Sequence, residues 1–282
     1  MDLPNIRYEC LQEKDYPAAR EMLKADAISG EQFLRVLEKW PKSLTAAYMG
    51  DTMAALAQIE RTLPQAYTVV FVSQSLRRQG IGSLAAAYAE NELRACGAKK
   101  VRTSFPQSND AARAFAGKIQ YNPYFSSACM QRTGSPFSLE ALPVRQYEDA
   151  DYVACQALYA NAFHEMRLRV GCFPDSAVAK PSEKERGEWQ ADAANRFVYE
   201  EMGEIAAFGH IDGNELSSVA VDTRFQGRGI GRRFVMYLCN AMYLRGHDTV
   251  SLWCVVGNYA RKLYESLGFE EKYISDFMRK TL

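Results

Sequence analysis

The sequence lacks an apolar run long enough to cross a membrane, a C-x-x-C pair, and an excess of charge of either sign. Its 282 residues include 34 Lys and Arg and 34 Asp and Glu, so the formal net charge is zero. Proteins that bind nucleic acids generally carry an excess of basic side chains. A membrane helix needs roughly 20 consecutive apolar residues. We therefore expect a protein that binds neither nucleic acid nor membrane.

The sequence also lacks a disulfide framework and a leader segment. Its seven cysteines are scattered and odd in number, which favours reduced thiols over paired ones. The first residues, "MDLPNIRYEC", have neither the basic start nor the apolar centre of a secretory signal. These features predict a cytoplasmic protein, and we expect no metal cofactor.

What the sequence does contain is an internal repeat. The stretch "VAVDTRFQGRGIGRRF" at 219–234 has a near-copy, "VFVSQSLRRQGIGSL", at 70–84. Their last glycines, Gly82 and Gly231, lie 149 positions apart (231 − 82). The same offset aligns Val72 with Val221, Ile81 with Ile230, Val101 with Val250 and Asn109 with Asn258. A constant offset of about half the chain indicates a tandem pair of domains rather than a solenoid.

The repeat changes register towards the start of each half. Asp15-Tyr16 matches Asp151-Tyr152 at an offset of 136 (151 − 15), so the second half carries thirteen more residues (149 − 136) before its glycine loop. The extra residues fall around 164–195, a charged segment with Pro174, Pro181 and Gly187. Such a composition predicts a loop or a short helix.

Each half shows the same order of elements. A short strand and a helix precede two antiparallel strands, and a β-branched strand then enters the glycine loop, followed by a helix, a strand and a last helix. The stretch "RTGSPFSLEALP" at 132–143 has the composition of a linker. We therefore predict domains at 1–139 and 140–282. Each is expected to be of the α+β class, a mixed and mostly antiparallel sheet flanked by helices in three layers.

The glycine loop has the features of a phosphate site. A turn from a strand into a helix presents free N–H groups at the positive end of the helix dipole. Gly229 and Gly231 lack a Cβ and would allow a pyrophosphate to approach, while Arg228, Arg232 and Arg233 add positive charge. The loop matches neither G-x-x-x-x-G-K-[ST] nor G-x-G-x-x-G. On these residues alone, a tight turn without a ligand fits as well.

Two motifs of the second half together resemble the GNAT N-acetyltransferase superfamily. Gln226–Gly231 is similar to its acyl-CoA pyrophosphate loop, [RQ]-x-x-G-x-[GA]. "NYARKLYESLGF", at 258–269, is similar to its last helix, N-x-x-A-x-x-x-Y-x-x-x-G-F, with the alanine one place early. The resemblance covers the whole second half, and extends more loosely to the first half through Arg77–Gly82 and Asn109.

The resemblance implies an acetyl-CoA-dependent N-acetyltransferase. Loop amides would hold the pyrophosphate, main-chain groups of Val219 and Val221 would pair with the pantetheine arm, and Asn258 would hydrogen-bond it. The implied cofactor-binding residues are Val219, Val221, Gln226, Gly227, Arg228, Gly229, Ile230, Gly231, Arg232 and Asn258. Tyr264 would protonate the leaving thiolate, since a phenol with a pKa of about 10 keeps its proton at neutral pH.

Several residues are candidates for the general base. Glu215, at the start of the strand before the loop, is the preferred one. His210 and Glu204 on the preceding strand are alternatives, as is His164-Glu165 in the longer segment. Each of them also fits a solvated strand or helix end. No serine or cysteine has an evident base nearby in sequence, so we expect direct attack by an amine.

The first half lacks the proton donor. Phe115 occupies the position of Tyr264 at the common offset, or Ala116 does if one inserted residue is allowed. Ser83 and Leu84 stand where the second half has Arg232 and Arg233. We therefore expect the first domain to be catalytically silent. It would support the second domain or bind CoA weakly.

Other functions remain open from the sequence. A CoA-binding sensor or scaffold without turnover would use the same loop. The duplication also resembles the tandem acetyltransferases of thiol-cofactor synthesis, which would imply an amino-sugar acceptor. The acceptor, a small molecule or a protein, is not selected by any motif, and either a monomer or a homodimer is compatible with the sequence.

Overall fold

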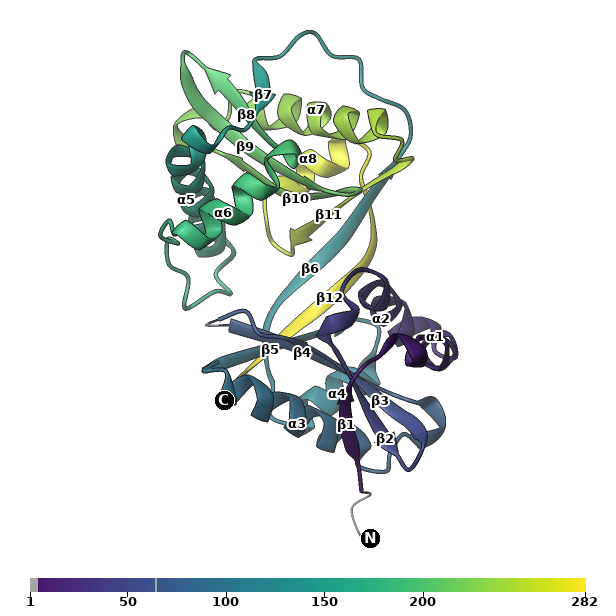
Figure 1. The fold of residues 1–282 in the computed structure, drawn as a ribbon. Helices are drawn as coiled ribbons and strands as arrows, with labels where there is room; N and C mark the ends of the chain where they lie inside the picture. The colour runs from purple at the N-terminus through teal and green to yellow at the C-terminus, as the bar shows by residue number, and fades with distance from the viewer. Residues whose placement is uncertain (1–4, 64) are drawn as a thin grey trace. The chain divides into compact units, whose positions relative to one another are not determined.

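The chain forms two compact units, seen in a computed structural model that describes residues 5–63 and 65–282 (Figure 1). One unit extends to Tyr124 and includes Ser275–Leu282, and the other comprises Phe125–Ile274. Each has a mixed, mostly antiparallel sheet with helices packed on it. The predicted α+β class and the tandem arrangement are confirmed.

The N-terminal unit has the strand order β1-β2-β3-β4-β5-β12, in which β4 and β5 are parallel and all other neighbouring strands are antiparallel. Its elements are β1 (Arg7–Cys10), α1 (Tyr16–Lys24), α2 (Ala27–Lys39), β2 (Leu44–Met49), β3 (Thr52–Glu60), β4 (Gln65–Val72), α3 (Ile81–Ala95), β5 (Lys100–Pro106), α4 (Asp110–Lys118) and the end of β12 (Glu270–Thr281).

The C-terminal unit has the strand order β6-β11-β10-β9-β8-β7, in which β10 and β11 are parallel. Its elements are most of β6 (Asn122–Thr133), then β7 (Val144–Gln146), α5 (Tyr152–Val170), α6 (Glu183–Ala191), β8 (Arg196–Glu201), β9 (Glu204–Asp212), β10 (Glu215–Val221), α7 (Ile230–Leu244), β11 (Thr249–Val255) and α8 (Ala260–Ser266).

The last strand of each sequence half belongs to the sheet of the other unit. β6 follows α4 in the chain, yet its residues 127–133 pair with β11. β12 follows α8, yet its residues 275–281 pair with β5, beside which it is drawn in yellow in Figure 1. The compact units therefore divide after Tyr124, fifteen residues before the boundary predicted at 139/140 (139 − 124). Strand periodicity shows that a strand exists but does not show which neighbour it joins.

Helices cover both faces of the C-terminal sheet. Phe234, Leu238 and Met242 recur at a spacing of four along α7, so they lie on one side of the helix and are fully buried against the sheet. On the other face, where α5 and α6 lie, Trp189 stacks on Phe208 with ring centroids 4.7 Å apart. The sheet is thus held rigidly between two apolar layers.

The longer segment of the second half contains a short helix, as its composition predicted. α5 continues to Val170 and stops at Gly171, whose φ of 78° is the left-handed conformation that favours glycine. α6 then begins after Ser182, whose hydroxyl accepts a hydrogen bond from the amide of Glu185 at 3.2 Å.

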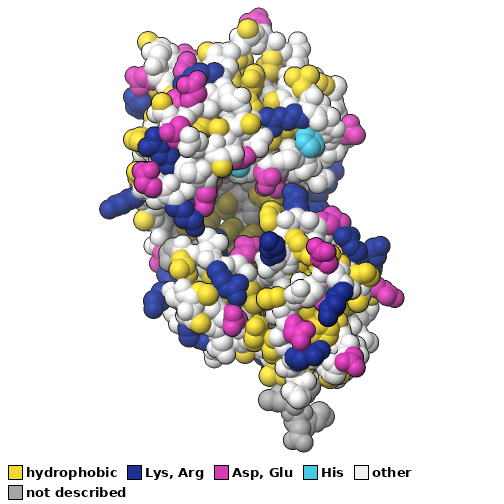
Figure 2. All heavy atoms as spheres, viewed as in Figure 1, with side chains coloured by type: hydrophobic (Ala, Val, Ile, Leu, Met, Phe, Trp, Pro, Cys, Tyr) yellow, Lys and Arg dark blue, Asp and Glu magenta, His cyan; other side chains and the backbone are white. Residues whose placement is uncertain are grey.

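The surface carries charge of both signs. Figure 2 shows Lys and Arg interspersed with Asp and Glu over the face in view. Within the ranges 5–63 and 65–282, no helix has the length and apolar character needed to cross a membrane. The cysteines of these ranges are unpaired, in agreement with the reduced thiols expected from the sequence.

Candidate active site

The glycine loop leads from β10 through a short 3-10 turn, Thr223–Phe225, into α7. Gly227 and Gly229 have φ of 78° and 76°, a conformation in which any other residue would be strained. The hydrogen bonding of α7 begins with the amide of Arg233, which donates to the carbonyl of Gly229 at 3.2 Å. The amides of Ile230–Arg232 precede it, so they have no intrahelical acceptor and are free for a ligand.

Side chains of the loop hold its shape. Gln226 donates from Nε2 to the carbonyl of Val221 at 3.0 Å, which ties the loop to the end of β10. Arg228 lies over an aromatic ring of the preceding turn, 5.3 Å from its centroid. Arg232 donates to Ser266 Oγ at 2.6 Å and so connects α7 to α8. Both arginines are exposed and leave positive charge beside the free amides.

β10 and β11 separate beside the loop. Among the described residues their parallel pairing reaches Leu216 and Leu252 and goes no further, although β10 continues to Val221 and β11 to Val255. β10 stays paired with β9 over the same stretch. This divergence leaves the β11-facing backbone around Val219 without a strand partner.

Tyr264 lies on α8 and packs against the same core cluster as the end of β10. Its ring meets that of Phe269 edge to face, with centroids 5.9 Å apart. Burial, with a smaller contribution from Cys254, raises the pKa of its phenol above the usual value of 10. The phenol therefore keeps its proton at neutral pH, as a general acid must. Asn258 caps α8 by accepting from the amide of Ala260 at 3.0 Å.

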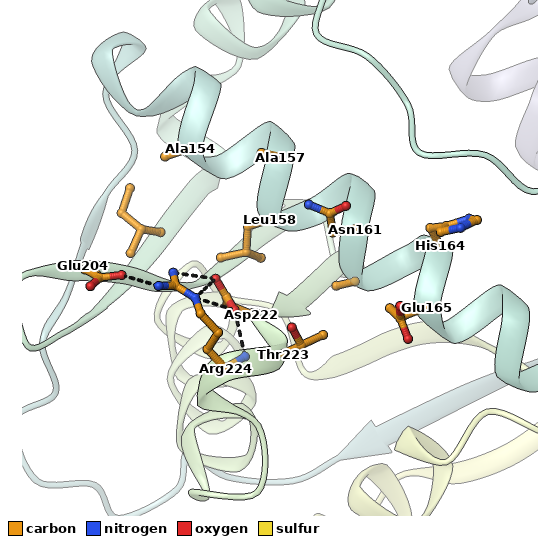
Figure 3. A pocket seen from close by; sticks show the side chains of 12 residues that line it. Ala154, Ala157, Leu158, Asn161, His164, Glu165, Glu204, Asp222, Thr223 and Arg224 are labelled. Carbon is orange, nitrogen blue, oxygen red and sulfur yellow. Dashed lines mark hydrogen bonds and ion pairs between the residues drawn. The ribbon is translucent and has the colours of Figure 1, made fainter.

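Two candidate bases are held in ion pairs. Glu204 lies 2.9 Å from a guanidinium nitrogen of Arg224, which also binds Asp222, as the dashed lines of Figure 3 show. Glu165 is within 4.0 Å of Arg169, one helical turn away. Each of these carboxylates is thus already engaged by a guanidinium group.

The preferred base, Glu215, and the candidate His164 lie elsewhere. Glu215 occupies the first position of β10, opposite Asp212 of β9 and Ser251 of β11. His164 lies on α5, where its Nδ1 is 3.0 Å from Ser176 Oγ.

A cavity of about 710 Å³ lies on the α5 face of the C-terminal unit. Its walls come from α5, the start of β9 and the turn after β10, and Figure 3 shows polar side chains of all three directed towards it. The lining residues are Ala154, Ala157, Leu158, Asn161, Ala162, His164, Glu165, Glu204, Ile205, Asp222, Thr223 and Arg224.

One series of hydrogen bonds between side chains was not predicted from the sequence. His210 on β9 contacts Ser217 Oγ of β10 through Nδ1 at 2.9 Å, and Asp192 Oδ2 through Nε2 at 2.6 Å. The hairpin turn at Gly213 places His210 and Ser217 on facing strands, so a register assignment could have suggested that pair. Asp192, beyond the end of α6, gave no signal.

The N-terminal unit has no phenol at the equivalent place. The amide of Phe269 donates to the carbonyl of Tyr264 at 3.0 Å, and the amide of Tyr121 donates to that of Ala116 at 2.9 Å. These matching helix ends lie 148 positions apart, not 149. The counterpart of Tyr264 is therefore Ala116 rather than Phe115.

Phe115 instead fills space beside the N-terminal loop. A Cβ on Gly82 would lie 3.3 Å from the ring of Phe115. The cavity where β4 and β5 separate measures only about 60 Å³. It is lined by Thr68, Val69, Val70, Ala86, Thr103, Ser104, Phe105, Ala112, Phe115, Ala116, Ile119 and Tyr121.

Comparison with known proteins agrees with this geometry. The sequence profile of the acetyltransferase (GNAT) family matches residues 7–120 and again 162–269. The chain belongs to the GNAT family. Curated relatives include the [ribosomal protein bS18]-alanine N-acetyltransferase of Escherichia coli, 35% identical over 98 residues. The match spans 66% of that enzyme and 33% of this GNAT chain.

Solved structures share the tandem fold. A GCN5-related N-acetyltransferase from Sphaerobacter thermophilus has a TM-score of 0.73 at 20% identity, covering 99% of this chain and 97% of its own. A tandem GNAT protein from the clavulanic acid biosynthesis pathway has a TM-score of 0.64 at 16% identity, with 98% of both chains covered. At such identities these likenesses concern the fold alone.

Proposed function

We propose that the C-terminal unit transfers the acetyl group of acetyl-CoA to a primary amine of a small molecule or protein. The observation that carries this proposal is the divergence of β10 from β11 beside a loop whose first-turn amides have no intrahelical acceptor. Membership of the GNAT family supports it. The family names of the relatives support N-acetyl transfer as the reaction class.

Acetyl-CoA is a substrate in this proposal, and the chain offers groups for each of its parts. Amides from Gly227 to Arg232 would hold the pyrophosphate at the positive end of α7. The open edge of β10, with main-chain groups of Val219 and Val221, would bind the pantetheine arm, and Asn258 would add a hydrogen bond. A backbone N–H facing this gap would stabilise the tetrahedral oxyanion.

The amine would attack the thioester directly. Its lone pair forms the new C–N bond, the C–S bond breaks, and Tyr264 protonates the departing thiolate. Glu215 is the base that the sequence favours. Because Ala116 cannot donate a proton, residues 1–139 would contribute no turnover, which leaves 140–282 as the catalytic segment.

Binding tests this proposal with a matched pair of loop variants. Gly229→Glu places a carboxylate where the pyrophosphate would bind, and should weaken acetyl-CoA binding by about 100-fold or more in calorimetry. Gly80→Glu makes the same change at a glycine with a φ of 84°, so its backbone strain is similar. Thermal unfolding of both variants, and of Gly229→Ala, separates strain from charge.

Turnover is then measured as CoA release over an amine panel. The panel includes a peptide with an N-terminal alanine, because the curated relatives are named for that acceptor. Release that depends on Gly229 but not on Gly80 supports the proposal. Tight binding without release from any amine would indicate a CoA sensor instead. Loss of binding only in Gly80→Glu would move the cofactor site to the other unit.

A further inference from the structure

Asp192, His210 and Ser217 form a continuous chain of hydrogen bonds that ends at the surface. The carboxylate–imidazole distance is 2.6 Å and the imidazole–hydroxyl distance is 2.9 Å. The histidine side chain is only 17% exposed, whereas Ser217 is exposed. The chain therefore connects a buried imidazole to solvent through one hydroxyl.

The hydrogen bonds determine which imidazole nitrogen of His210 carries the hydrogen. An ionised Asp192 can only accept, so Nε2 of His210 carries the hydrogen. Nδ1 then has a lone pair and accepts the hydroxyl hydrogen of Ser217. The hydroxyl oxygen keeps its own lone pairs, which can accept a proton from a third group. This is the arrangement of a base acting through a hydroxyl.

The carboxylate of Asp192 is itself held in place. Asn195 donates to its Oδ1 at 2.6 Å, and Arg196 lies 3.4 Å from its Oδ2. Asn195 in turn accepts a hydrogen bond of 2.8 Å from Arg245, the residue that follows α7. These contacts orient Asp192 towards the imidazole.

Ser217 lies where β10 leaves its neighbour. The pairing of β10 with β9 shifts register between Leu216 and Ser218, which marks a bulge at Ser217. Pairing of β10 with β11 ends at Leu216. Bulges re-aim side chains and are frequent beside active sites. The hydroxyl is therefore two residues from Val219, where the backbone edge becomes open.

The charges around His210 favour its neutral form. Burial and the guanidinium of Arg196 on β8 lower its pKa below 6.5, and Asp192 and Asp212 oppose them only in part. On β10, Glu215 precedes Ser217 by two positions and lies opposite Asp212. At neutral pH the imidazole is thus unprotonated and able to accept.

We propose that Asp192, His210 and Ser217 form a proton relay that deprotonates the ammonium group of the acceptor. This inference rests on the acetyl transfer proposed above. It makes His210 the proton acceptor, Ser217 the group that touches the substrate, and Asp192 a positioning residue.

The ammonium N–H bond breaks as Ser217 Oγ gains that proton and passes its own to His210 Nδ1. The neutral amine attacks the thioester carbon, and the C–S bond breaks while Tyr264 protonates sulfur. The nitrogen loses a second proton to water, Tyr264 recovers one, and the imidazolium releases its proton. The net reaction forms the amide, CoA thiol and one proton.

Histidine NMR tests the relay without any acceptor. The chain has three histidines, which His→Gln variants assign. We expect His210 to be the Nε2–H tautomer with a pKa below 6.5, and Asp192→Asn to lower that pKa further and remove the tautomer preference. His164, which contacts Ser176 at 3.0 Å, is the matched histidine–serine pair and should not respond. A cationic or Nδ1–H His210 at pH 7 would overturn the relay.

Kinetics with the most active amine of the panel supply the second arm. His210→Gln should lower kcat/KM by about 100-fold or more. In the wild type, kcat/KM should rise with pH at a midpoint equal to the pKa of His210 measured by NMR. His210→Gln should abolish this rise without weakening acetyl-CoA binding. Ser217→Ala should lower kcat/KM about 10-fold or more, whereas His247→Gln should change nothing.

Each contrary result has a distinct meaning. If Glu215→Gln removes the pH-dependent rise and His210→Gln does not, Glu215 is the base and the relay is wrong. Acetylated Ser217 trapped by acid quench and detected by mass spectrometry would replace the relay with a covalent route. If no amine releases CoA, the proposed function fails, and the NMR result alone decides the protonation chemistry of His210.

Discussion

The helices α4 and α8 end in the same backbone hydrogen bonds but carry different chemistry. In α8 the residue that accepts from the closing amide is Tyr264, and in α4 it is Ala116, which is 3% exposed within its core. The phenol of one unit is thus replaced by a methyl group in the other, with no change in how the helix closes. The comparison teaches that duplication preserved the backbone while the reactive group was kept in one copy.

The two units also differ in the size of the side chains that a sheet strand and the helix after the loop place against each other. Gly209 of β9 faces Phe234 and Leu238 of α7, and a Cβ built on it would lie 2.6 Å from Leu238. Gly209 pairs with Val219, and the counterpart of Val219 in the N-terminal unit is Val70. Because Val70 pairs with Ala57, the counterpart of Gly209 is Ala57. The helix residues 149 positions earlier are Ala85 and Ala89, both fully buried. The N-terminal unit therefore has smaller side chains on the helix and a larger side chain on the strand that faces it.

The loops also differ in backbone strain. Arg78 has a φ of 66° where the C-terminal loop has Gly227 at 78°. A left-handed conformation is costly for a residue with a long side chain. Arg77, at the position of Gln226, donates to the carbonyl of Val72 at 3.1 Å and to Asp26 at 2.5 Å. The N-terminal loop is therefore held by its own side chains.

Removing the phenol should erase the functional difference between the two units. Tyr264→Phe is expected to lower kcat about 100-fold or more, with little change in acetyl-CoA affinity, because only the acid is lost. Since burial raises the pKa of Tyr264, the wild type should show no loss of acid function up to about pH 10. Stopped CoA-release assays over that pH range test both statements.

Tyr259→Phe is the control for this variant. Its ring lies just before α8 and is 53% exposed, so turnover should not change. Unchanged turnover in Tyr264→Phe would show that both units lack a phenolic acid.

Adding one methyl group should test the packing difference. Gly209→Ala is expected to cost about 1–3 kcal/mol in chemical unfolding, because Leu238 and Phe234 must move. In a Leu238→Ala background the additional cost should fall to near zero, as the contact is gone. An equal loss of unfolding free energy in the wild-type and Leu238→Ala backgrounds would show that side-chain volume on the helix does not explain the glycine on the strand.

The first helices of the two units should differ in acid stability. Arg145 binds Asp151 through two hydrogen bonds of 2.7 and 2.8 Å and lowers its pKa, whereas the position of Arg145 in the other unit, 136 residues earlier, is Glu9. Asp151→Asn should cost about 1–2 kcal/mol at pH 7, and Asp15→Asn less.

The sign of the pH effect follows from the lowered pKa of Asp151. Its ionised form is favoured by folding, so the stabilisation is complete above the unfolded pKa of about 4 and disappears as pH falls through the folded value. Unfolding of wild type and Asp151→Asn from pH 7 to pH 2 should show a gap that closes only below about pH 4. A gap independent of pH would refute the ion-pair explanation.

Local patterns predicted much of this molecule because they report backbone requirements. Gly227 and Gly229 are needed for their φ, and the spacing of four along α7 marks its buried side, so loop, helix and repeat could be inferred. The positions of Asp192 and Ser217 depend on how α6 and the hairpin meet, which no spacing encodes. The one-residue difference between Tyr264 and Ala116 required the hydrogen bonds of the helix ends.

The pairing of β5 with β12 has a consequence for the order of synthesis. Pro106 at the end of β5 pairs with Ser275. The ribosome must therefore add 169 further residues (275 − 106) before this partner exists. At 5–20 residues per second, that takes roughly 10–35 s. Throughout this time the nascent sheet exposes unpaired N–H and C=O groups, which other chains can join. The N-terminal sheet is therefore completed after translation of the C-terminal half, and chaperones have a defined interval in which to protect it.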